Sequence, residues 1–195
     1  MIHPATRLQY IGEHKGIGVV ATEFIPKGTI TWIFDEMDMV FTPEQMEQMD
    51  PLYKEFMEVY SYVDHDGRSI LCWDHARFVN HSYVSNCIST AYNFELAVRD
   101  IQPGEELTDD YGYLNLTEPF MAPPEEGSSR VMVLPDDLER YFGIWDVQLI
   151  EAFKQFNSVK QPLARLIDKQ YLGKVKAVAD GNEEMDSILT CRYKK

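Results

Sequence analysis

One stretch of this 195-residue chain says most about its fold. It is Gly104-Glu105-Glu106-Leu107-Thr108-Asp109-Asp110-Tyr111-Gly112. A single tyrosine stands here between acidic residues and a glycine, shortly after the apolar Leu107. Taken alone, the pattern also fits a short strand whose tyrosine is a core or interface aromatic. Its meaning therefore depends on two segments that come earlier in the chain.

The first of these segments is Lys15-Gly16-Ile17-Gly18, which precedes a β-like run. Glycines let a backbone approach a ligand closely, although glycine pairs are more often simple turns. The second segment is Arg77-Phe78-Val79-Asn80-His81-Ser82, which is followed by Asn86. Buried polar groups need partners, so this cluster is either a hydrogen-bonded turn or a ligand site. By itself, His81 is equally consistent with a satisfied structural histidine.

In this order, the three segments resemble the signature of the SET-domain lysine methyltransferases. That family has a Gly-x-Gly turn, then Arg-Phe-x-Asn-His-Ser, then Glu-Leu-Thr-x-Asp-Tyr-Gly. The resemblance covers roughly residues 8–116. It implies a β-rich fold, mainly β with some α, in which small sheets surround a knot-like core and the last motif threads under an earlier segment. It also implies transfer of a methyl group from S-adenosylmethionine to a lysine side chain.

The resemblance assigns roles to individual positions. The catalytic residue would be Tyr111. The residues that bind S-adenosylmethionine would be Lys15, Gly16, Ile17, Gly18, Asn80, His81 and Tyr111. The candidates for the substrate channel are Tyr60, Tyr62, Asp109 and Trp145, and the choice between the first two stays open because either is also a plausible core residue. Relatives often have Phe or Tyr where this chain has Asp109, so the number of methyl groups transferred is left open.

The chemistry of methyl transfer fits these residue types. The attacking amine must be neutral, yet a free lysine has a pKa of about 10.4. A narrow apolar channel disfavours the ammonium form, and alignment of amine, methyl and sulfur then supplies much of the rate. A tyrosine hydroxyl can hold the polarised methyl group through weak C–H···O contacts. We therefore expect Tyr111 to orient the reaction rather than to act as a strong base.

One departure from the family concerns zinc. Many relatives bind zinc with a cysteine in the central motif and three more after the domain. Here Tyr83 replaces that cysteine, and the loop at residues 121–130 contains none. A structural zinc site needs about four such ligands, so we predict no zinc. The helical segment at residues 135–156, with Tyr141, Phe142 and Trp145, is then the candidate that closes the site, although these aromatics could equally serve to dock the helices.

The predicted organisation is a SET domain over residues 1–118 with an acidic insert at about 35–64, a loop at 119–134 and a helical extension at 135–195. Pro26-Lys27-Gly28 predicts a hairpin-like connection between two strands. Thr42-Pro43 predicts a helix start, and Pro51 should interrupt that segment. In the extension, one helical face carries Trp145, Leu149, Phe153 and Phe156; Gly143 and Pro162 should divide the region into about three helices, before a frayed polar tail.

The formal net charge is −14, and nine acids but only one basic residue, Lys54, lie between residues 35 and 64. Such a charge argues against direct nucleic-acid binding and favours a basic protein or peptide as substrate, such as a histone-like protein.

No apolar run approaches the length of a membrane span, so we expect no membrane association. The short, zinc-free form resembles bacterial family members; this favours the cytoplasm, with a secreted effector reaching host chromatin as the alternative. A catalytically weak module that only binds cofactor or basic peptides is the competing function, and the oligomeric state is open.

Overall fold

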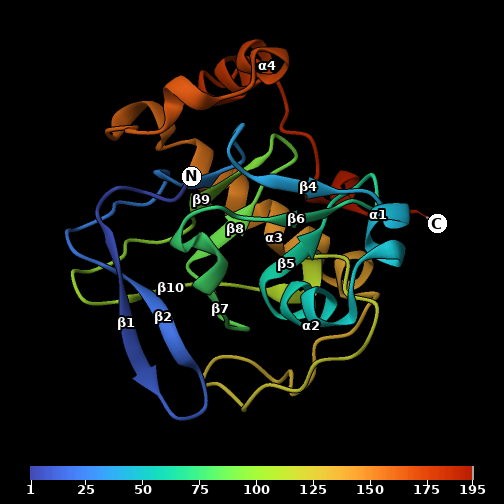
Figure 1. Ribbon diagram of the computed structural model, residues 1–195. Helices are drawn as coiled ribbons and strands as arrows, with labels where there is room; N and C mark the ends of the chain where they lie inside the picture. Colours follow the sequence, from blue (N-terminus) through green and yellow to red (C-terminus); the bar gives the residue numbers. More distant parts are fainter. Residues whose placement is uncertain (195) are drawn as a thin grey trace.

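The computed structural model describes residues 1–194, which form three small β-sheets and four α-helices. The first sheet has the order β1 (Thr6–Gly12), β2 (Gly16–Ala21), β10 (Glu106–Asp109), β7 (Asn80–His81). The second has the order β3 (Ile30–Ile33), β9 (Phe94–Ala97), β8 (Cys87–Ser89), and the third β4 (Met39–Phe41), β6 (Ser69–Leu71), β5 (Ser61–Val63). In Figure 1, α4 lies above the sheets, α1 and α2 lie to one side of them, and α3 lies in the middle of the view. The predicted β-rich fold class is confirmed.

The connection between β2 and β3 differs from the prediction. Pro26-Lys27-Gly28 does not close a hairpin, because β2 pairs with β1 and β10 whereas β3 pairs with β9 in another sheet. Gly28 has φ 88° and donates its N–H to the carbonyl of Ala97 at 2.8 Å. A Cβ on Gly28 would lie 2.7 Å from the carbonyl oxygen of Ala152. The turn therefore carries the chain from one sheet to the next, past a closely packed helix.

Strand β10 brings the three motifs together. It runs antiparallel to β2 through Leu107 and Val19, and parallel to β7 through Asp109 and His81. Parallel pairing of such short strands requires a long connection between them. The side chain of Asn86 fixes this arrangement, because it donates to the carbonyl of Glu106 at 2.7 Å and accepts from the N–H of Thr108 at 2.9 Å. Asn86 is fully buried and serves to hold β10 in place.

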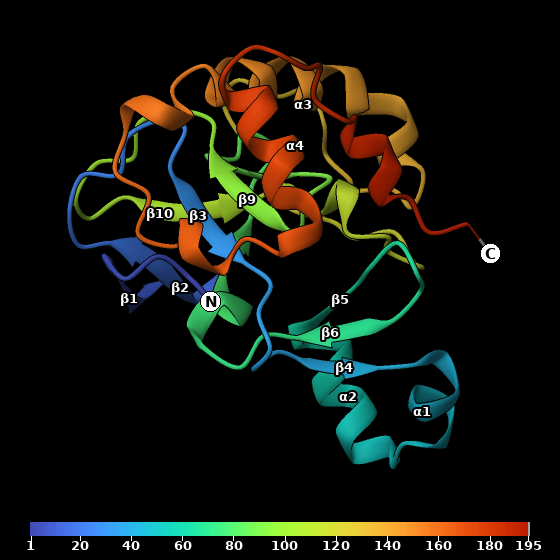
Figure 2. The same cartoon turned by 90° about the horizontal axis from the view of Figure 1, so that it is seen from above.

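The insert forms two short helices and also supplies strands β4 and β5 of the third sheet. Thr42 caps α1 (Pro43–Gln48) in a reciprocal capping box with Gln45, which confirms the predicted helix start. Met49 is extended, and Pro51 then opens α2 (Pro51–Tyr60) behind the N-cap Asp50, so the predicted interruption is also confirmed. Figure 2 shows this unit projecting from the body of the protein.

The C-terminal region packs two helices, α3 (Asp137–Phe153) and α4 (Lys169–Ala179), on the second sheet (Figure 2). The predicted apolar face is confirmed, because Trp145, Leu149, Phe153 and Phe156 are all buried. Gly143 does not break the helix, so the prediction of a break at this residue was wrong. A glycine costs only about 1 kcal/mol in a helix, and burial of this face outweighs it.

The tail is also better ordered than predicted. Ile188 in the short 3-10 helix η5 (Ile188–Cys191) is fully buried, and its N–H donates to the carboxylate of Asp146 at 2.8 Å. The other 3-10 turns are η1 (His75–Phe78), η2 (Tyr111–Tyr113), η3 (Phe156–Ser158) and η4 (Ala164–Leu166). None of the helices formed by residues 1–194 has the length and apolar character needed to span a membrane.

Candidate functional site

Residues from the three motifs meet where β2, β10 and β7 lie side by side. Gly18 on β2 is buried against Asn80 and Glu106, and a Cβ at this position would come within 2.5 Å of the Glu106 carboxylate and 2.8 Å of the Asn80 amide nitrogen. The glycine is therefore required by close approach of two other site residues. The structure thus brings the predicted glycine turn and Asn80 together.

Glu106 links these two motifs. Its Oε1 accepts a hydrogen bond from the side-chain amide of Asn80 at 2.8 Å, and its Oε2 lies 3.0 Å from the Lys15 ammonium. The Asn80 amide also donates to the carbonyl of Ile17 at 3.2 Å. Glu106 was not predicted as a site residue, although it lies inside the motif that decides the fold. The sequence did contain a signal for this role. Successive side chains of a strand point to opposite faces, so with the apolar Leu107 facing the core, Glu106 faces the other side.

His81 is buried and neutral. Its Nδ1 accepts the backbone N–H of Tyr111 at 3.2 Å, so the proton resides on Nε2. Burial lowers the pKa of His81 to about 4. The carboxylate of Asp110, 4.0 Å away, is therefore not a partner in an ion pair at neutral pH. Nε2 is buried and has no hydrogen-bond partner among residues 1–194.

Tyr111 is fixed at the centre of this arrangement. Its hydroxyl donates to the carbonyl of Val79 at 2.8 Å, and its ring lies 5.3 Å from the ring of His81. Burial, reinforced by the charges of Asp109 and Glu106, raises the pKa of Tyr111. The hydroxyl stays protonated, and its hydrogen is used in the bond to Val79. Only the lone pairs of its oxygen are left to interact with a ligand.

The predicted channel residues are distributed differently. Tyr60 packs on Phe78 with ring centroids 5.4 Å apart, and Phe78 precedes Val79, the partner of Tyr111. Tyr62 packs edge-on against Trp32 in a core cluster. Trp145 is buried in the other core cluster, where it packs edge-on on Tyr113 at 5.1 Å. Of these aromatics, Tyr60 is the one that packs on Phe78, the neighbour of the residue that accepts the Tyr111 hydroxyl.

Asp109 belongs to a buried acidic cluster. Its carboxylate accepts the hydroxyl of Tyr113 and shares a hydrogen bond with the carboxyl of Glu95 on β9. Burial, and then the negative charge of Asp109, raises the pKa of Glu95 well above its usual range; burial likewise raises the pKa of Asp109 to about 6. Both shifts favour a proton shared between the two carboxyl groups.

Residues 119–134, which we term the covering segment, contribute contacts that were not predicted. Phe120 packs against the rings of both His81 and Tyr111, each with centroids 5.8 Å apart. Glu125 accepts hydrogen bonds from the Ser82 hydroxyl and the Tyr83 N–H. The helical segment, predicted to close the site, supports the covering segment through Asp137 and Tyr141, whereas Phe120 makes the direct contacts.

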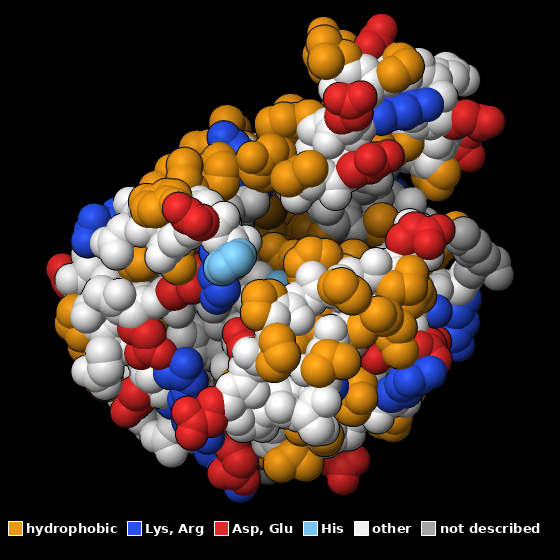
Figure 3. Space-filling model, turned by 90° about the horizontal axis from the view of Figure 1, so that it is seen from below, with side chains coloured by type: hydrophobic (Ala, Val, Ile, Leu, Met, Phe, Trp, Pro, Cys, Tyr) orange, Lys and Arg blue, Asp and Glu red, His pale blue; other side chains and the backbone are white. Residues whose placement is uncertain are grey.

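The molecular surface is hollowed between the insert and the body, with apolar side chains around the hollow (Figure 3). Exposed apolar residues on the surrounding elements include Ile17 on β2, Phe56 on α2, and Phe120 and Met121 on the covering segment. Acidic residues lie on the projecting insert. Such a face suits a ligand or peptide that has an apolar part and a positive charge.

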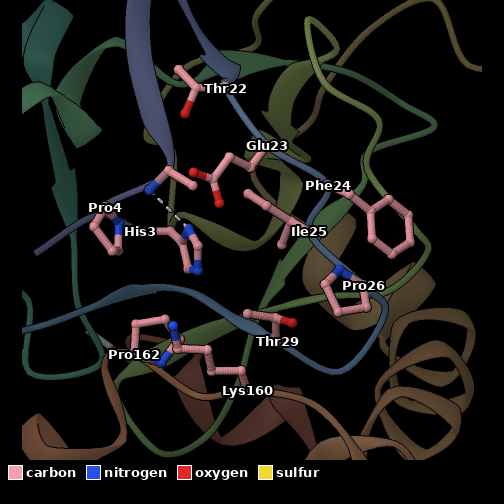
Figure 4. Close-up of a pocket in the computed structure, with 11 residues that line it drawn as sticks. His3, Pro4, Thr22, Glu23, Phe24, Ile25, Pro26, Thr29, Lys160 and Pro162 are labelled. Carbon is pink, nitrogen blue, oxygen red and sulfur yellow. Dashed lines mark hydrogen bonds between the residues drawn. The ribbon is translucent and has the colours of Figure 1, made fainter.

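A separate pocket of about 280 Å³ does not coincide with the motifs. His3, Glu23, Thr29 and Lys160 contribute to its lining, with Glu23 and Lys160 on opposite sides of His3 (Figure 4). None of its lining residues belongs to the three motifs. We place the candidate site at the motifs, because there a buried donor without a partner among residues 1–194, a closely packed glycine and a fixed tyrosine come together.

The chain is similar to known proteins in sequence and in structure. Residues 16–112 match the SET domain family model, and the chain belongs to the SET-domain family. Histone-lysine N-methyltransferase Set2 of Drosophila melanogaster is 32% identical over 114 residues, which are 52% of this chain and only 5% of that protein. A Plasmodium falciparum protein described as a histone methyltransferase is similar in structure, with a TM-score of 0.41 and 20% identity over 56% of this chain and 95% of its own.

No group of three or more His, Cys, Asp or Glu suited to a metal ion occurs among the described residues 1–194. The three cysteines lie apart as free thiols, two of them buried. Burial raises the pKa of Cys72 and Cys87 well above the usual range, so neither offers a thiolate at neutral pH.

Proposed function

We propose that this chain is a protein-lysine methyltransferase that uses S-adenosylmethionine, with Tyr111 at the reaction centre. The observation that carries the proposal is the placement of Tyr111: its protonated hydroxyl is held by Val79, and its N–H by His81, beside the glycine turn. Membership of the SET-domain family and the similarity to Set2 support the same activity.

The residues present fit the cofactor. His81 Nε2 is a buried donor without a partner within residues 1–194, and both hydrogen bonds of the Asn80 side chain use its nitrogen, which leaves its amide oxygen for a ligand. A ligand with several polar groups would satisfy both atoms. We assign the binding of S-adenosylmethionine to Lys15, Gly16, Ile17, Gly18, Asn80, His81 and Tyr111.

S-adenosylmethionine, when bound, supplies an electrophilic methyl group on a sulfonium. Tyr111 contributes orientation, because its hydroxyl hydrogen is engaged by Val79 and its lone pairs are free for weak contacts with a polarised methyl group. Its raised pKa excludes a role as general base at neutral pH. The lysine must therefore lose its proton to water or to another group before it attacks.

We assign Tyr60 to the lysine channel, together with Phe56 and Phe78, whose rings pack on it at 4.7 and 5.4 Å. An apolar wall disfavours a charged ammonium, which helps the amine to become neutral. The Asp109 carboxylate remains a candidate for this channel, although its hydrogen bonds are made with Tyr113 and Glu95 inside the protein.

We propose a basic protein or peptide as substrate. Of the nine acids in the insert, three are used inside the structure: Asp35 pairs with the N-terminus, Asp38 is buried and Asp64 pairs with Arg68. The remaining six are exposed and form no ion pair with other residues of the described part; they are Glu36, Glu44, Glu47, Asp50, Glu55 and Glu58. These six carboxylates are the charge that would attract a lysine-rich segment.

The test is transfer of a labelled methyl group from S-adenosylmethionine to histones and to proteins of a cell lysate, with mass spectrometry to locate the product. The proposal predicts label on lysine side chains. Binding of S-adenosylhomocysteine without any transfer would indicate instead a module that binds ligands without turnover. Absence of both would remove the function altogether.

A further inference from the structure

The covering segment has almost no regular structure of its own. One isolated bridge, made by the backbone groups of Phe120 and Val133 at 2.9 and 2.8 Å, closes it at its two ends. Much of the stretch between them is exposed. A segment with so few internal bonds needs external contacts to stay over His81 and Tyr111.

Arg130 supplies the most extensive of these contacts. Its guanidinium bridges two carboxylates: it pairs with Asp110, with Nη2 3.2 Å from Oδ1, and with Asp137, with Nη2 2.6 Å from Oδ2. It also lies over the rings of Tyr83 and Tyr141, at 4.8 and 4.6 Å from their centroids. One side chain thus joins the covering segment to the N-cap of η2 directly after β10, to α3 and to the turn after β7.

Among residues 1–194, Arg130 is the one cationic side chain that pairs with both carboxylates. Asp110 and Asp137 are each 1% exposed. Between Arg99 and Arg140 the sequence contains eleven acids and a single basic residue, Arg130. Buried carboxylates remain ionised only if paired, and a planar guanidinium can serve two of them while it stacks on aromatic rings. This isolated arginine is the sequence signal that could have revealed the contact.

The link from Arg130 to the reaction centre is short. Asp110 directly precedes Tyr111, and its second function is to cap η2 by accepting the N–H of Gly112 at 3.0 Å. A shift of the Asp110 carboxylate would therefore move the backbone that carries Tyr111. On the other side of Arg130, Asp137 accepts the N–H of Leu134 at 2.9 Å and anchors the end of the covering segment.

We propose that Arg130 is a positioning residue: it locks the covering segment over His81 and Tyr111 and fixes the backbone of Tyr111 through Asp110. The closure of the site then depends on an arginine bridge between two buried carboxylates. Its consequence for methyl transfer rests on the proposed function, whereas its consequence for the covering segment does not.

The first test measures hydrogen exchange at three amides that the closed segment protects: Phe120, Val133 and Tyr83. In Arg130→Met we expect exchange at least tenfold faster at all three, with β3 and β9 unchanged. The matched control is Arg140→Met, which removes an exposed pair with Asp136. Unchanged exchange in folded Arg130→Met would overturn the proposal.

Two milder variants keep the test decisive if Arg130→Met does not fold. Arg130→Lys keeps the charge without the planar fork, and Asp137→Asn leaves Arg130 paired with Asp110 alone. We expect both to fold and to exchange the same three amides severalfold faster than the natural protein. Wild-type exchange in both would contradict the role of the bridge.

The second test concerns the site itself. We expect Arg130→Lys to weaken binding of S-adenosylhomocysteine about tenfold and to lower kcat further, because both the cover and Tyr111 are displaced; Arg140→Met should change neither. Faster exchange without any change in affinity or kcat would refute the positioning role. If the natural protein binds no S-adenosylhomocysteine, the proposed function fails, and the exchange data still decide whether Arg130 holds the segment.

Discussion

Tyr111 is constrained from both its backbone and its hydroxyl. The N–H reaches His81 and the hydroxyl reaches Val79, two residues apart on the same neighbouring segment. The ring therefore has little freedom to rotate or to shift along β7. A side chain held in this way contributes through geometry, since a misplacement of about 1 Å can cost roughly 10²-fold in rate.

Gly18 provides a test of the cofactor side of the site. In Gly18→Ala the new Cβ would displace the Asn80 amide and the Glu106 carboxylate, which lie 2.8 and 2.5 Å from its position. We expect affinity for S-adenosylhomocysteine to fall about tenfold, or about 1.4 kcal/mol, measured by calorimetry. Gly143→Ala on α3 meets nothing within 4 Å and should bind normally while gaining about 0.5–1 kcal/mol in stability. Equal affinities for both variants would contradict the site.

The Glu95–Asp109 pair makes a prediction about pH. Because burial raises both folded-state pKa values, the pair stabilises the protein at low pH. That stability is lost as pH rises through the folded-state pKa values, of which that of Asp109 is about 6 and that of Glu95 lies well above the usual range. Glu95→Gln cannot ionise but can still donate to Asp109. We expect the unfolding free energy of Glu95→Gln, relative to the natural protein, to increase by about 1 kcal/mol per pH unit between pH 5 and 7. Chemical denaturation at several pH values measures this difference, and a constant or falling difference would be inconsistent with a buried proton-sharing pair.

At the level of secondary-structure elements, the insert carries many exposed acidic residues but contributes few residues to the core. Its core contacts are few, with Met57 the only buried residue of α2, while exposed acids line both helices. The unit projects beside the hollow on the face shown in Figure 3. Substitution of its exposed acidic residues should therefore have little effect on the stability of the fold.

Glu55→Lys on α2 tests whether this charge recruits substrate. We expect KM for a lysine-rich peptide to rise severalfold with kcat unchanged, because an exposed charge attracts the peptide without touching the reacting atoms. The effect should shrink as salt is added. Glu184→Lys, an exposed reversal of equal size in the C-terminal region, is the control. The same KM for both variants would rule out a specific role of the insert.

At the scale of the whole molecule, the C-terminal helices and the second sheet share one core. Leu149 and Phe153 of α3 belong to the same buried cluster as Ile33 of β3 and Phe94 of β9. The SET domain and its helical extension thus bury one another, and the hydrophobic effect couples their stability.

Leu149→Ala should therefore destabilise both regions together. Leu149 is fully buried, and such truncations cost about 2–5 kcal/mol. We expect denaturant unfolding, followed by the fluorescence of the three tryptophans Trp32, Trp73 and Trp145 and by far-ultraviolet circular dichroism, to shift by the same amount in one transition. Two separated transitions would show that the extension is an independent unit.

The sequence predicted the class of fold mainly through the ordered motifs. It also brought Gly18, Asn80, His81 and Tyr111 into one candidate site, whereas Tyr62 and Trp145 pack in the core clusters instead. Periodicity identified the face of Trp145 and Leu149, since a helix repeats its contacts locally. Strands of two to four residues carry no such signal, so the pairing of β10 with β7 and the change of sheet at Gly28 could not be derived from it. The Arg130 bridge joins residues on three elements, and long-range ion pairs leave only a weak trace in sequence.

The role of Tyr111 in methyl transfer is tested most directly by comparing Tyr111→Phe with Tyr10→Phe, a control at an exposed position of β1. The measurement is the rate of labelled methyl transfer to a lysine-rich peptide at saturating S-adenosylmethionine, together with the affinity for S-adenosylhomocysteine. We predict that Tyr111→Phe lowers kcat about 10²-fold and leaves the affinity within about threefold, while Tyr10→Phe changes neither. A Tyr111→Phe enzyme that transfers methyl groups as fast as the natural protein would contradict the account.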